Sequence, residues 1–290
     1  MNNLAVQYLS HYGYMPSGVM SLAVDISTAN MLFADAIKKF QEVAGLPMTG
    51  EWNTATFDKM LMPRCGLMDV RRSTFAEARW RKTDLTYFVE KWVGGLTPAD
   101  ADDLIELAWQ DWMNVADFKI KPTLDRNADI IISTGSGRTD GFDGPSGTLA
   151  WAYLPNGSDG QLLCRFDLSE TWLKDNPQGG ILFRNVACHE FGHLLGLEHS
   201  RMSSALMAPF YSPSVVSPRA SDDIPRIVAM YGKATTLPPP VRPLPAPNTV
   251  RLSKALNAGT YGDISLGSTM GAGDYVMLLT GDGNGPPPVP

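Results

Sequence analysis

The chain has 290 residues, which is long enough for two modest domains with tails. Its 44% hydrophobic and 19% charged residues are ordinary for a soluble globular protein, while a net charge of −6 without a basic stripe argues against nucleic-acid and anionic-membrane partners. No apolar run approaches the roughly 18 residues that a transmembrane helix needs. No secretory signal is visible after Met1, so either a signal has been removed or the protein is not exported by that route.

The first part of the chain, residues 1–62, is predicted to be a small helical domain. Leu4 to Tyr12 is a short amphipathic segment, and apolar residues recur at helical spacing from Asn30 to Val43. Gly45 to Pro47 ends that helix, and a last helix starts at Thr54. This domain is followed by a connecting segment, residues 63–79.

A second domain is predicted over residues 80–232. One helix begins at Thr97 and another follows Gly179. Ser221–Asp223 caps a last helix, Ile224 to Tyr231, because acids are favourable at a helix N-terminus. The Trp stripe of the first of these helices is assigned to the core. Segments of alternating or β-branched residues predict five strands: Asp84–Val89, Phe118–Lys121, Ala128–Ser133, Thr148–Leu154 and Leu162–Asp167. Strands and helices are segregated, which indicates an α+β fold.

Two stretches are predicted to lack regular structure. Arg71–Thr74 is polar and basic, so it is either a protease-sensitive site or a merely solvated connector. Residues 233–290 form a Pro/Gly-rich linker and tail, in which Thr235–Thr249 is an extended spacer and Val250–Leu279 is only weakly β-like. The tail is therefore predicted to be disordered or a truncated domain.

A histidine motif points to a catalytic metal. His189 and His193 are four residues apart on a predicted helix, so both imidazoles reach the same ion. Gly196 allows a positive φ at which the chain can turn, and His199 then supplies a third ligand. Three neutral nitrogens leave one tetrahedral position of zinc open, as in catalytic sites. Glu190, next to the first ligand, is the predicted base for a water bound there.

A second motif lies more than a hundred residues upstream, at Pro63, Arg64, Cys65, Gly66 and Asp69. A thiolate is a strong zinc ligand that needs a cation to lower its pKa. A cysteine that occupies the open zinc position would displace the water and inhibit the enzyme.

The chain has two further cysteines, Cys164 and Cys188. With Cys65 the total is three, so not all of them can form disulfides within the chain. Whether those two pair cannot be read from the sequence.

Together the two motifs resemble the matrix metalloproteinases, which are metzincin zinc endopeptidases with a cysteine-switch propeptide. This chain departs from the switch pattern at Met68, where the family has proline. Ala44–Thr54 resembles both the family's propeptide and a peptidoglycan-binding-like helical module. The resemblance implies a five-stranded mixed sheet with three helices, and a three-helix propeptide. It also implies that Arg64 and Asp69 pair to hold the switch over the cleft.

The resemblance also implies substrate-binding residues. Met207 would pack beneath the zinc ligands, and Pro209 and Tyr211 would line the S1′ pocket. Leu149 and Ala150 match the edge strand to which a peptide substrate adds as an antiparallel strand.

A structural calcium site is the next implication. Calcium takes carboxylate and carbonyl oxygens. The matching residues are the carboxylates of Asp143, Asp167 and Glu170 and the main-chain oxygens of Gly144, Ser146 and Thr148.

The family's second, structural zinc lacks its histidines here. Arg138 or Thr139, Trp151 and Arg165 stand in their places, and Asp140 keeps only the acidic position. We therefore expect one zinc per chain, with Arg138, Arg165 and Asp140 as an ion-pair network in place of the second metal.

The sequence thus predicts a secreted zymogen, a zinc- and calcium-binding hydrolase. It would cleave proteins of the extracellular matrix or other extracellular proteins after an activating protease removes the propeptide. Its partners would be protein or peptide substrates and no nucleic acid. The alternative is a cell-wall or glycan-binding protein that uses its N-terminal helical module. A binding module, however, does not need the cysteine motif directly after it.

Overall fold

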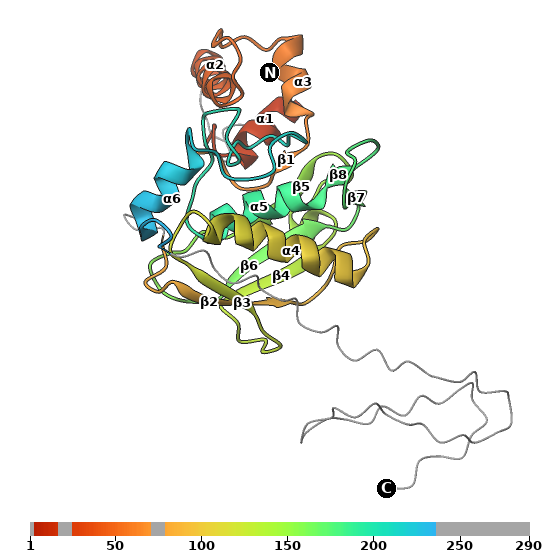
Figure 1. The fold of residues 1–290 in the computed structure, drawn as a ribbon. Coiled ribbons are helices and arrows are strands. Elements are labelled where there is room, and N and C mark those ends of the chain that lie inside the picture. The colour runs from red at the N-terminus through yellow and green to blue at the C-terminus, as the bar shows by residue number, and fades with distance from the viewer. Residues whose placement is uncertain (1–2, 17–24, 71–78, 236–290) are drawn as a thin grey trace, which may run out of the picture. The chain divides into compact units, whose positions relative to one another are not determined.

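A computed structural model describes residues 3–16, 25–70 and 79–235 of the chain (Figure 1). The predicted protease-sensitive stretch Arg71–Thr74 and the proline-rich spacer and tail from residue 236 onward lie outside the described residues. Among the described helices, none is both long and apolar enough to span a membrane.

The N-terminal domain contains three helices, as predicted: α1 (Asn3–His11), α2 (Ile26–Val43) and α3 (Thr54–Met60). Helix α2 begins four residues before the predicted Asn30, because the Asp25 side chain accepts a hydrogen bond from the Thr28 amide and caps the helix there. Their apolar faces share one core, which includes Leu9, Tyr12, Ile37, Phe40 and Met60.

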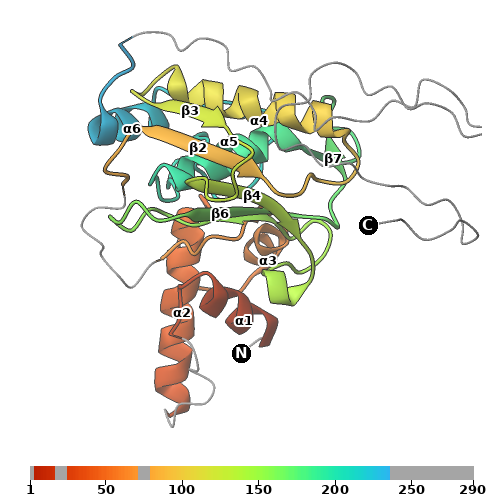
Figure 2. The ribbon, with the colours of Figure 1, turned by 90° about the horizontal axis from the view of Figure 1, so that it is seen from below.

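The second domain is built on the predicted mixed sheet. Its strands are β2 (Asp84–Val89), β3 (Lys119–Pro122), β4 (Ile130–Gly135), β5 (Thr148–Ala152) and β6 (Leu162–Asp167). They lie in the order β5-β6-β4-β2-β3, and only β5 is antiparallel to its neighbour in this set. Figure 2 shows the N-terminal helices on the side of the sheet where β6 lies, away from β2 and β3.

A sixth strand comes from the N-terminal part of the chain. β1 (Arg64–Cys65) pairs in parallel with the free edge of β5. The cysteine motif therefore completes the sheet of the second domain.

Three helices accompany the sheet, as predicted: α4 (Pro98–Met113), α5 (Phe183–Leu194) and α6 (Asp223–Tyr231). Helices α4 and α5 pack against each other (Figure 1) through the Trp stripe, with the rings of Trp109 and Phe191 stacked at 3.9 Å. The indole of Trp112 donates to the Cys188 carbonyl at 2.8 Å. Both tryptophans are buried, which confirms their assignment to the core.

Three short elements were not predicted. The 3-10 helix η1 (Arg138–Asp140) lies between β4 and β5, and β7 (Trp172–Leu173) pairs with β8 (Ile181–Leu182). Two-residue strands are too short to show a period in the sequence.

The predicted capping of α6 by its acids is wrong in detail. Asp222 occupies the N-cap but makes no capping bond with its side chain. Asp223 is fully buried, and its carboxylate accepts hydrogen bonds from the amides of Leu206, Met207 and Arg219. The acid at this helix start therefore joins α6 to the preceding loop.

Candidate active site

The histidine motif forms the end of α5 and the turn after it. His189 and His193 are one helical turn apart, and their Nε2 atoms lie 3.1 Å from each other. Gly196 has φ +104°, and the Leu197 amide closes the turn on the Gly192 carbonyl at 2.9 Å. The chain reverses there, as predicted, and brings His199 beside the other two rings.

Backbone carbonyls fix the orientation of two of these rings. His189 Nδ1 donates to the Leu206 carbonyl at 2.7 Å, and His193 Nδ1 donates to the Leu197 carbonyl at 2.6 Å. Their Nε2 atoms are therefore the unprotonated nitrogens, which a metal requires. Burial lowers the pKa of His189 to about 3 and lowers the pKa values of His193 and His199 too, so the imidazoles are neutral.

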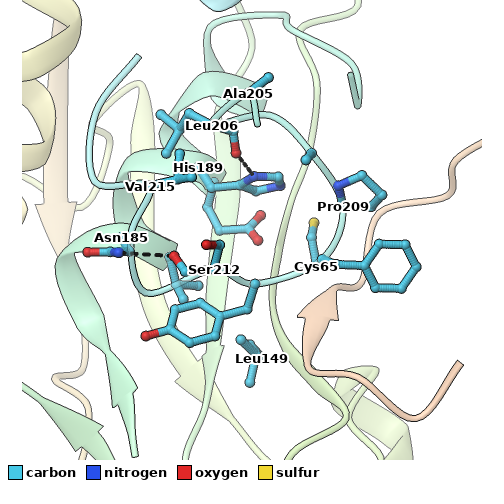
Figure 3. A pocket seen from close by; sticks show the side chains of 14 residues that line it. Cys65, Leu149, Asn185, His189, Ala205, Leu206, Pro209, Ser212 and Val215 are labelled. Atoms are coloured by element: carbon cyan, nitrogen blue, oxygen red, sulfur yellow. Dashed lines mark hydrogen bonds between the residues drawn. The ribbon is translucent and has the colours of Figure 1, made fainter. Parts of the chain in front are cut away.

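Cys65 completes a cluster of four candidate ligands. Its Sγ lies 3.5 Å from His193 Nε2, and one ligand atom from each of Cys65, His189, His193 and His199 lies within 4.8 Å of the others. Figure 3 shows the Cys65 and His189 side chains beside each other. Burial, then the Glu190 carboxylate, raises the pKa of the Cys65 thiol, so that a metal ion would have to supply the cation that favours the thiolate.

Buried polar atoms around the cluster lack partners. Both ring nitrogens of His199 and both carboxylate oxygens of Glu190 are buried without a hydrogen bond to the described residues. Such atoms are costly unless a cation or water satisfies them, so the residues present fit a bound zinc with an acid beside it. Burial raises the pKa of Glu190 to about 8, and the nearby Cys65 thiol offsets only part of that rise.

The switch segment, residues 63–69, lies between β5 and residues 209–211. Four backbone hydrogen bonds hold it: Arg64 N to Gly147 O (3.0 Å), Gly66 N to Ala150 O (2.8 Å), Cys65 N to Pro209 O (2.9 Å) and Tyr211 N to Pro63 O (2.9 Å). It is parallel to β5, whereas the predicted substrate strand is antiparallel. The switch segment thus occupies the predicted substrate position with the opposite chain direction.

Arg64 and Asp69 form the ion pair that the resemblance implied. Their side chains meet at 2.6 Å and are each 1% exposed. The guanidinium lies 3.5 Å from the Tyr12 ring centre and donates to Tyr8 Oη at 2.7 Å. Tyr14 donates to the other oxygen of Asp69 at 2.5 Å. Burial disfavours the charged carboxylate, yet Arg64 and then His199 hold the pKa of Asp69 well below its usual range.

Two small residues allow this close packing. A Cβ on Gly66 would lie 2.6 Å from Thr148 Cγ2. A Cβ on Gly192, the residue before His193, would collide with the sulfur of Met207, which is fully buried. Met68, which replaces the family's proline, is 41% exposed.

A small cavity of about 30 Å³ lies beside His189 and Glu190. Its lining includes three of the predicted substrate-binding residues, Leu149, Pro209 and Tyr211. The fourth, Ala150, instead bonds the switch segment through its carbonyl.

Asn185 also lines this cavity and was missed by the sequence analysis. It lies one helical turn before His189, and its amide donates to the Ser212 carbonyl at 3.3 Å (Figure 3). The same amide donates to the Pro213 carbonyl at 3.2 Å. The i, i+4 spacing to a candidate ligand was the available signal.

Asp223 was also missed as a site residue. Its carboxylate holds the amides of Leu206 and Met207 at 2.8 and 3.1 Å, and the Leu206 carbonyl in turn accepts from His189. Asp223 therefore supports the loop that orients a candidate ligand. The sequence did contain a signal for Asp223: two acids stand together at the helix start, and an N-cap uses only one side chain, so the second acid was free for another role.

The predicted calcium ligands lie around one loop. Gly144 and Ser146 have φ of +100° and +69°. Asp143 accepts from the Thr148 amide at 2.7 Å, and Glu170 accepts from the Ser146 amide at 2.6 Å. Asp167 Oδ2 is buried without a described partner, and burial, followed by the Asp167 and Asp143 carboxylates, raises the pKa of Glu170. The unpartnered oxygen and the crowded negative charge fit a cation.

An ion pair occupies the region where the family's pattern places histidines. Arg165 lies 2.5 Å from Asp140 and 5.8 Å from the centre of the Trp151 ring. The Trp151 indole donates to the Asp140 carbonyl at 2.7 Å, and Asp140 also accepts from the Ser136 amide. Arg138 is exposed on η1 and makes no ion pair with the described residues, so the expected network includes Arg165 and Asp140 but not Arg138.

The three cysteines are all buried and free. Cys164 and Cys188, whose pairing the sequence left open, form no disulfide with each other.

Residues 79–232 match the Matrixin peptidase family, and residues 4–60 match a peptidoglycan binding domain family. Interstitial collagenase of Oryctolagus cuniculus is 40% identical over 225 residues, covering 74% of this chain and 46% of that protein. Matrix metalloproteinase-19 of Homo sapiens is 35% identical over 305 residues, covering 97% of this chain and 58% of that protein.

The chain spans about half the length of the curated relatives it matches. The matched family covers more than half of the chain and contains the whole histidine motif, and the matched N-terminal domain leads directly into the switch segment. The chain therefore belongs to the matrixin family of metallopeptidases.

Proposed function

We propose that this chain is a latent zinc endopeptidase whose N-terminal propeptide holds it inactive. One observation carries the proposal: Cys65 Sγ and the ring nitrogens of His189, His193 and His199 converge within 4.8 Å beside Glu190. Three neutral nitrogens would hold the zinc, and the thiolate would occupy the position that the catalytic water needs. Latency and catalysis would thus compete for one coordination site.

Zinc bound here would lower the pKa of a coordinated water and polarise the scissile carbonyl. Glu190 would accept a proton from the water and return it to the leaving amine. Glu190 lines the same cavity as His189 and Cys65, so its carboxylate lies beside the position where that proton would be released.

Once the switch segment has left, β5 and residues 209–211 would bind a substrate backbone between them. The amides and carbonyls that now hold the switch segment would become free for an extended peptide. Leu149, Ala150, Pro209 and Tyr211 would contact the substrate, with Met207 as the floor of the zinc site.

The setting of this activity is inferred from the family. We propose a secreted enzyme that acts on extracellular proteins, including matrix proteins, and an activating protease that removes residues 1–79. Residues 80–232 would be the catalytic domain and residues 233–290 a linker and tail. Structural calcium would be held by Asp143, Asp167 and Glu170 with main-chain oxygens of Gly144, Ser146 and Thr148.

Glycan binding by α1–α3 is less well supported. Aromatic residues of this domain are engaged with the catalytic domain: Phe40 packs edge-on against Phe210 at 6.2 Å, and Tyr12 bonds to Thr148 at 3.3 Å. Family membership also favours the peptidase.

The test is cleavage of a quenched peptide by the purified chain before and after activation by a protease or a mercurial. The zinc content is measured on the same samples. We expect little cleavage before activation, strong cleavage after it, and a chelator-sensitive rate. A zinc-loaded, activated chain that cleaves none of a broad peptide library would overturn the proposal.

A further inference from the structure

A second side chain of the switch segment reaches the candidate metal ligands. Asp69 Oδ1 lies 2.7 Å from His199 Nδ1, and the two side chains are 1% and 4% exposed. The contact joins residues 130 positions apart and crosses from the propeptide to the catalytic domain. The two atoms are within hydrogen-bonding distance, although His199 Nδ1 makes no hydrogen bond of regular geometry with the described residues. Asp69 is paired with Arg64 and can only accept, so in a hydrogen bond between the two side chains His199 Nδ1 would be the donor.

The three histidines differ in the origin of their partners. His189 and His193 donate to the carbonyls of Leu206 and Leu197, both from the catalytic domain. His199 has its partner in a segment that activation removes. A carboxylate on the outer nitrogen of a ligating histidine fixes its tautomer and raises its basicity more than a neutral carbonyl does.

Asp69 is itself held firmly in place. Arg64 bonds the same Oδ1 atom at 2.6 Å, and the Tyr14 hydroxyl donates to Oδ2 at 2.5 Å. Arg64 balances the charge of the carboxylate, so His199 need not be protonated to pair with it. Both ring nitrogens of His199 are buried without a hydrogen bond to the described residues, and because Nδ1 lies against Asp69, Nε2 is the nitrogen left for the metal.

We propose that Asp69 is a positioning residue for the third zinc ligand, so that the propeptide strengthens metal binding through His199 as well as through Cys65. The proposal rests on the proposed function in taking zinc as the ion. Activation would then remove one ligand and the orienting carboxylate of another. The latent chain should therefore release zinc more slowly than a variant that lacks only the carboxylate.

The first experiment observes the contact itself. In the zinc-loaded latent chain with ¹⁵N-labelled histidine, NMR should show slowly exchanging Nδ1 protons for His189, His193 and His199. Asp69→Asn should shift the His199 signal and leave the other two unchanged. Tyr14→Phe is the matched control, because it removes the tyrosine hydrogen bond to the Asp69 carboxylate and leaves the carboxylate in place. It should shift the His199 signal little.

The second experiment measures zinc release to a chelator from the latent chain. Asp69→Asn should release zinc about tenfold faster or more, the usual effect of losing an outer partner of a ligand. Tyr14→Phe should stay near the parent rate. Reactivity of the Cys65 thiol toward a maleimide shows whether the switch segment is still seated in each variant.

The outcomes separate this proposal from the proposed function. A parent chain whose His199 Nδ1 proton exchanges freely with water overturns the Asp69 proposal, and so does a seated Asp69→Asn variant with unchanged zinc release. If Asp69→Asn unseats the switch, the exchange rate in the parent chain decides alone. Absence of zinc or of peptide cleavage after activation overturns the proposed function instead.

Discussion

The two halves of the candidate site are built in different ways. The histidine half comes from one short stretch, in which a helix and a turn at Gly196 bring three rings together. The switch half comes from residues more than a hundred positions away, and a two-residue strand with a buried ion pair holds it in place. Local geometry therefore assembles the catalytic half, while latency depends on long-range contacts that activation can break.

The largest expected effect is on the histidine half. Glu190→Ala should retain zinc and fold but lower peptide cleavage by the activated chain about 10³-fold, because the proton-transfer group is lost. Cleavage rate and zinc stoichiometry are measured together. Asp103→Ala, which removes an exposed acid on α4, is the control and should cleave normally. A rate near that of the parent would refute the role of Glu190, and loss of zinc would make the residue structural.

The switch half should respond in the opposite direction. Cys65→Ser should convert the latent chain to a spontaneously active one that loses its propeptide, since serine is a poor zinc ligand in place of the thiolate. The measurement is cleavage without activator, alongside the chain length on a gel. Cys188→Ala removes another buried thiol and should remain latent. If Cys65→Ser stays as silent as the parent until treated, the switch assignment is wrong.

The histidine half also has long-range support from Asp223. Asp223→Asn should lower the free energy of unfolding by about 2–4 kcal/mol, because three backbone amides lose a charged acceptor. Denaturant unfolding measures the change. Asp222→Asn removes a partly exposed ion pair with Arg226 and should cost about 0.5 kcal/mol or less. Equal effects of the two substitutions would remove the special role given to Asp223.

The smallest effect concerns Arg165 and Asp140. Arg165→Met should cost about 1 kcal/mol or less, since the pair is roughly one-third exposed. Metal analysis after gel filtration should return one zinc per chain, plus calcium, for both proteins. Two tightly held zincs would mean that a second set of ligands exists.

Sequence patterns predicted what local geometry controls. Strand Asp84–Val89 has the expected bounds, helix α3 starts at the expected Thr54, and the turn at Gly196 has the expected positive φ. The start of α2 was missed because it depends on one capping hydrogen bond of Asp25.

The missed parts of the site are long-range. Asp69 to His199, Asp223 to Leu206 and Asn185 to Ser212 each join segments whose approach is set by packing of the whole domain. No period in the sequence carries that information. The pairing of Arg64 with Asp69 was anticipated from the family resemblance, and the residues alone gave no geometry for it.

Zinc K-edge X-ray absorption of the chain before and after activation tests most directly whether Cys65 binds the zinc in the latent chain. The latent chain should show one sulfur at about 2.3 Å and three nitrogens at about 2.0 Å from the zinc. The activated chain should have lost the sulfur and kept the three nitrogens, with an oxygen in the open position. A latent chain without sulfur in the zinc shell would contradict the claim that Cys65 and the catalytic water compete for one site.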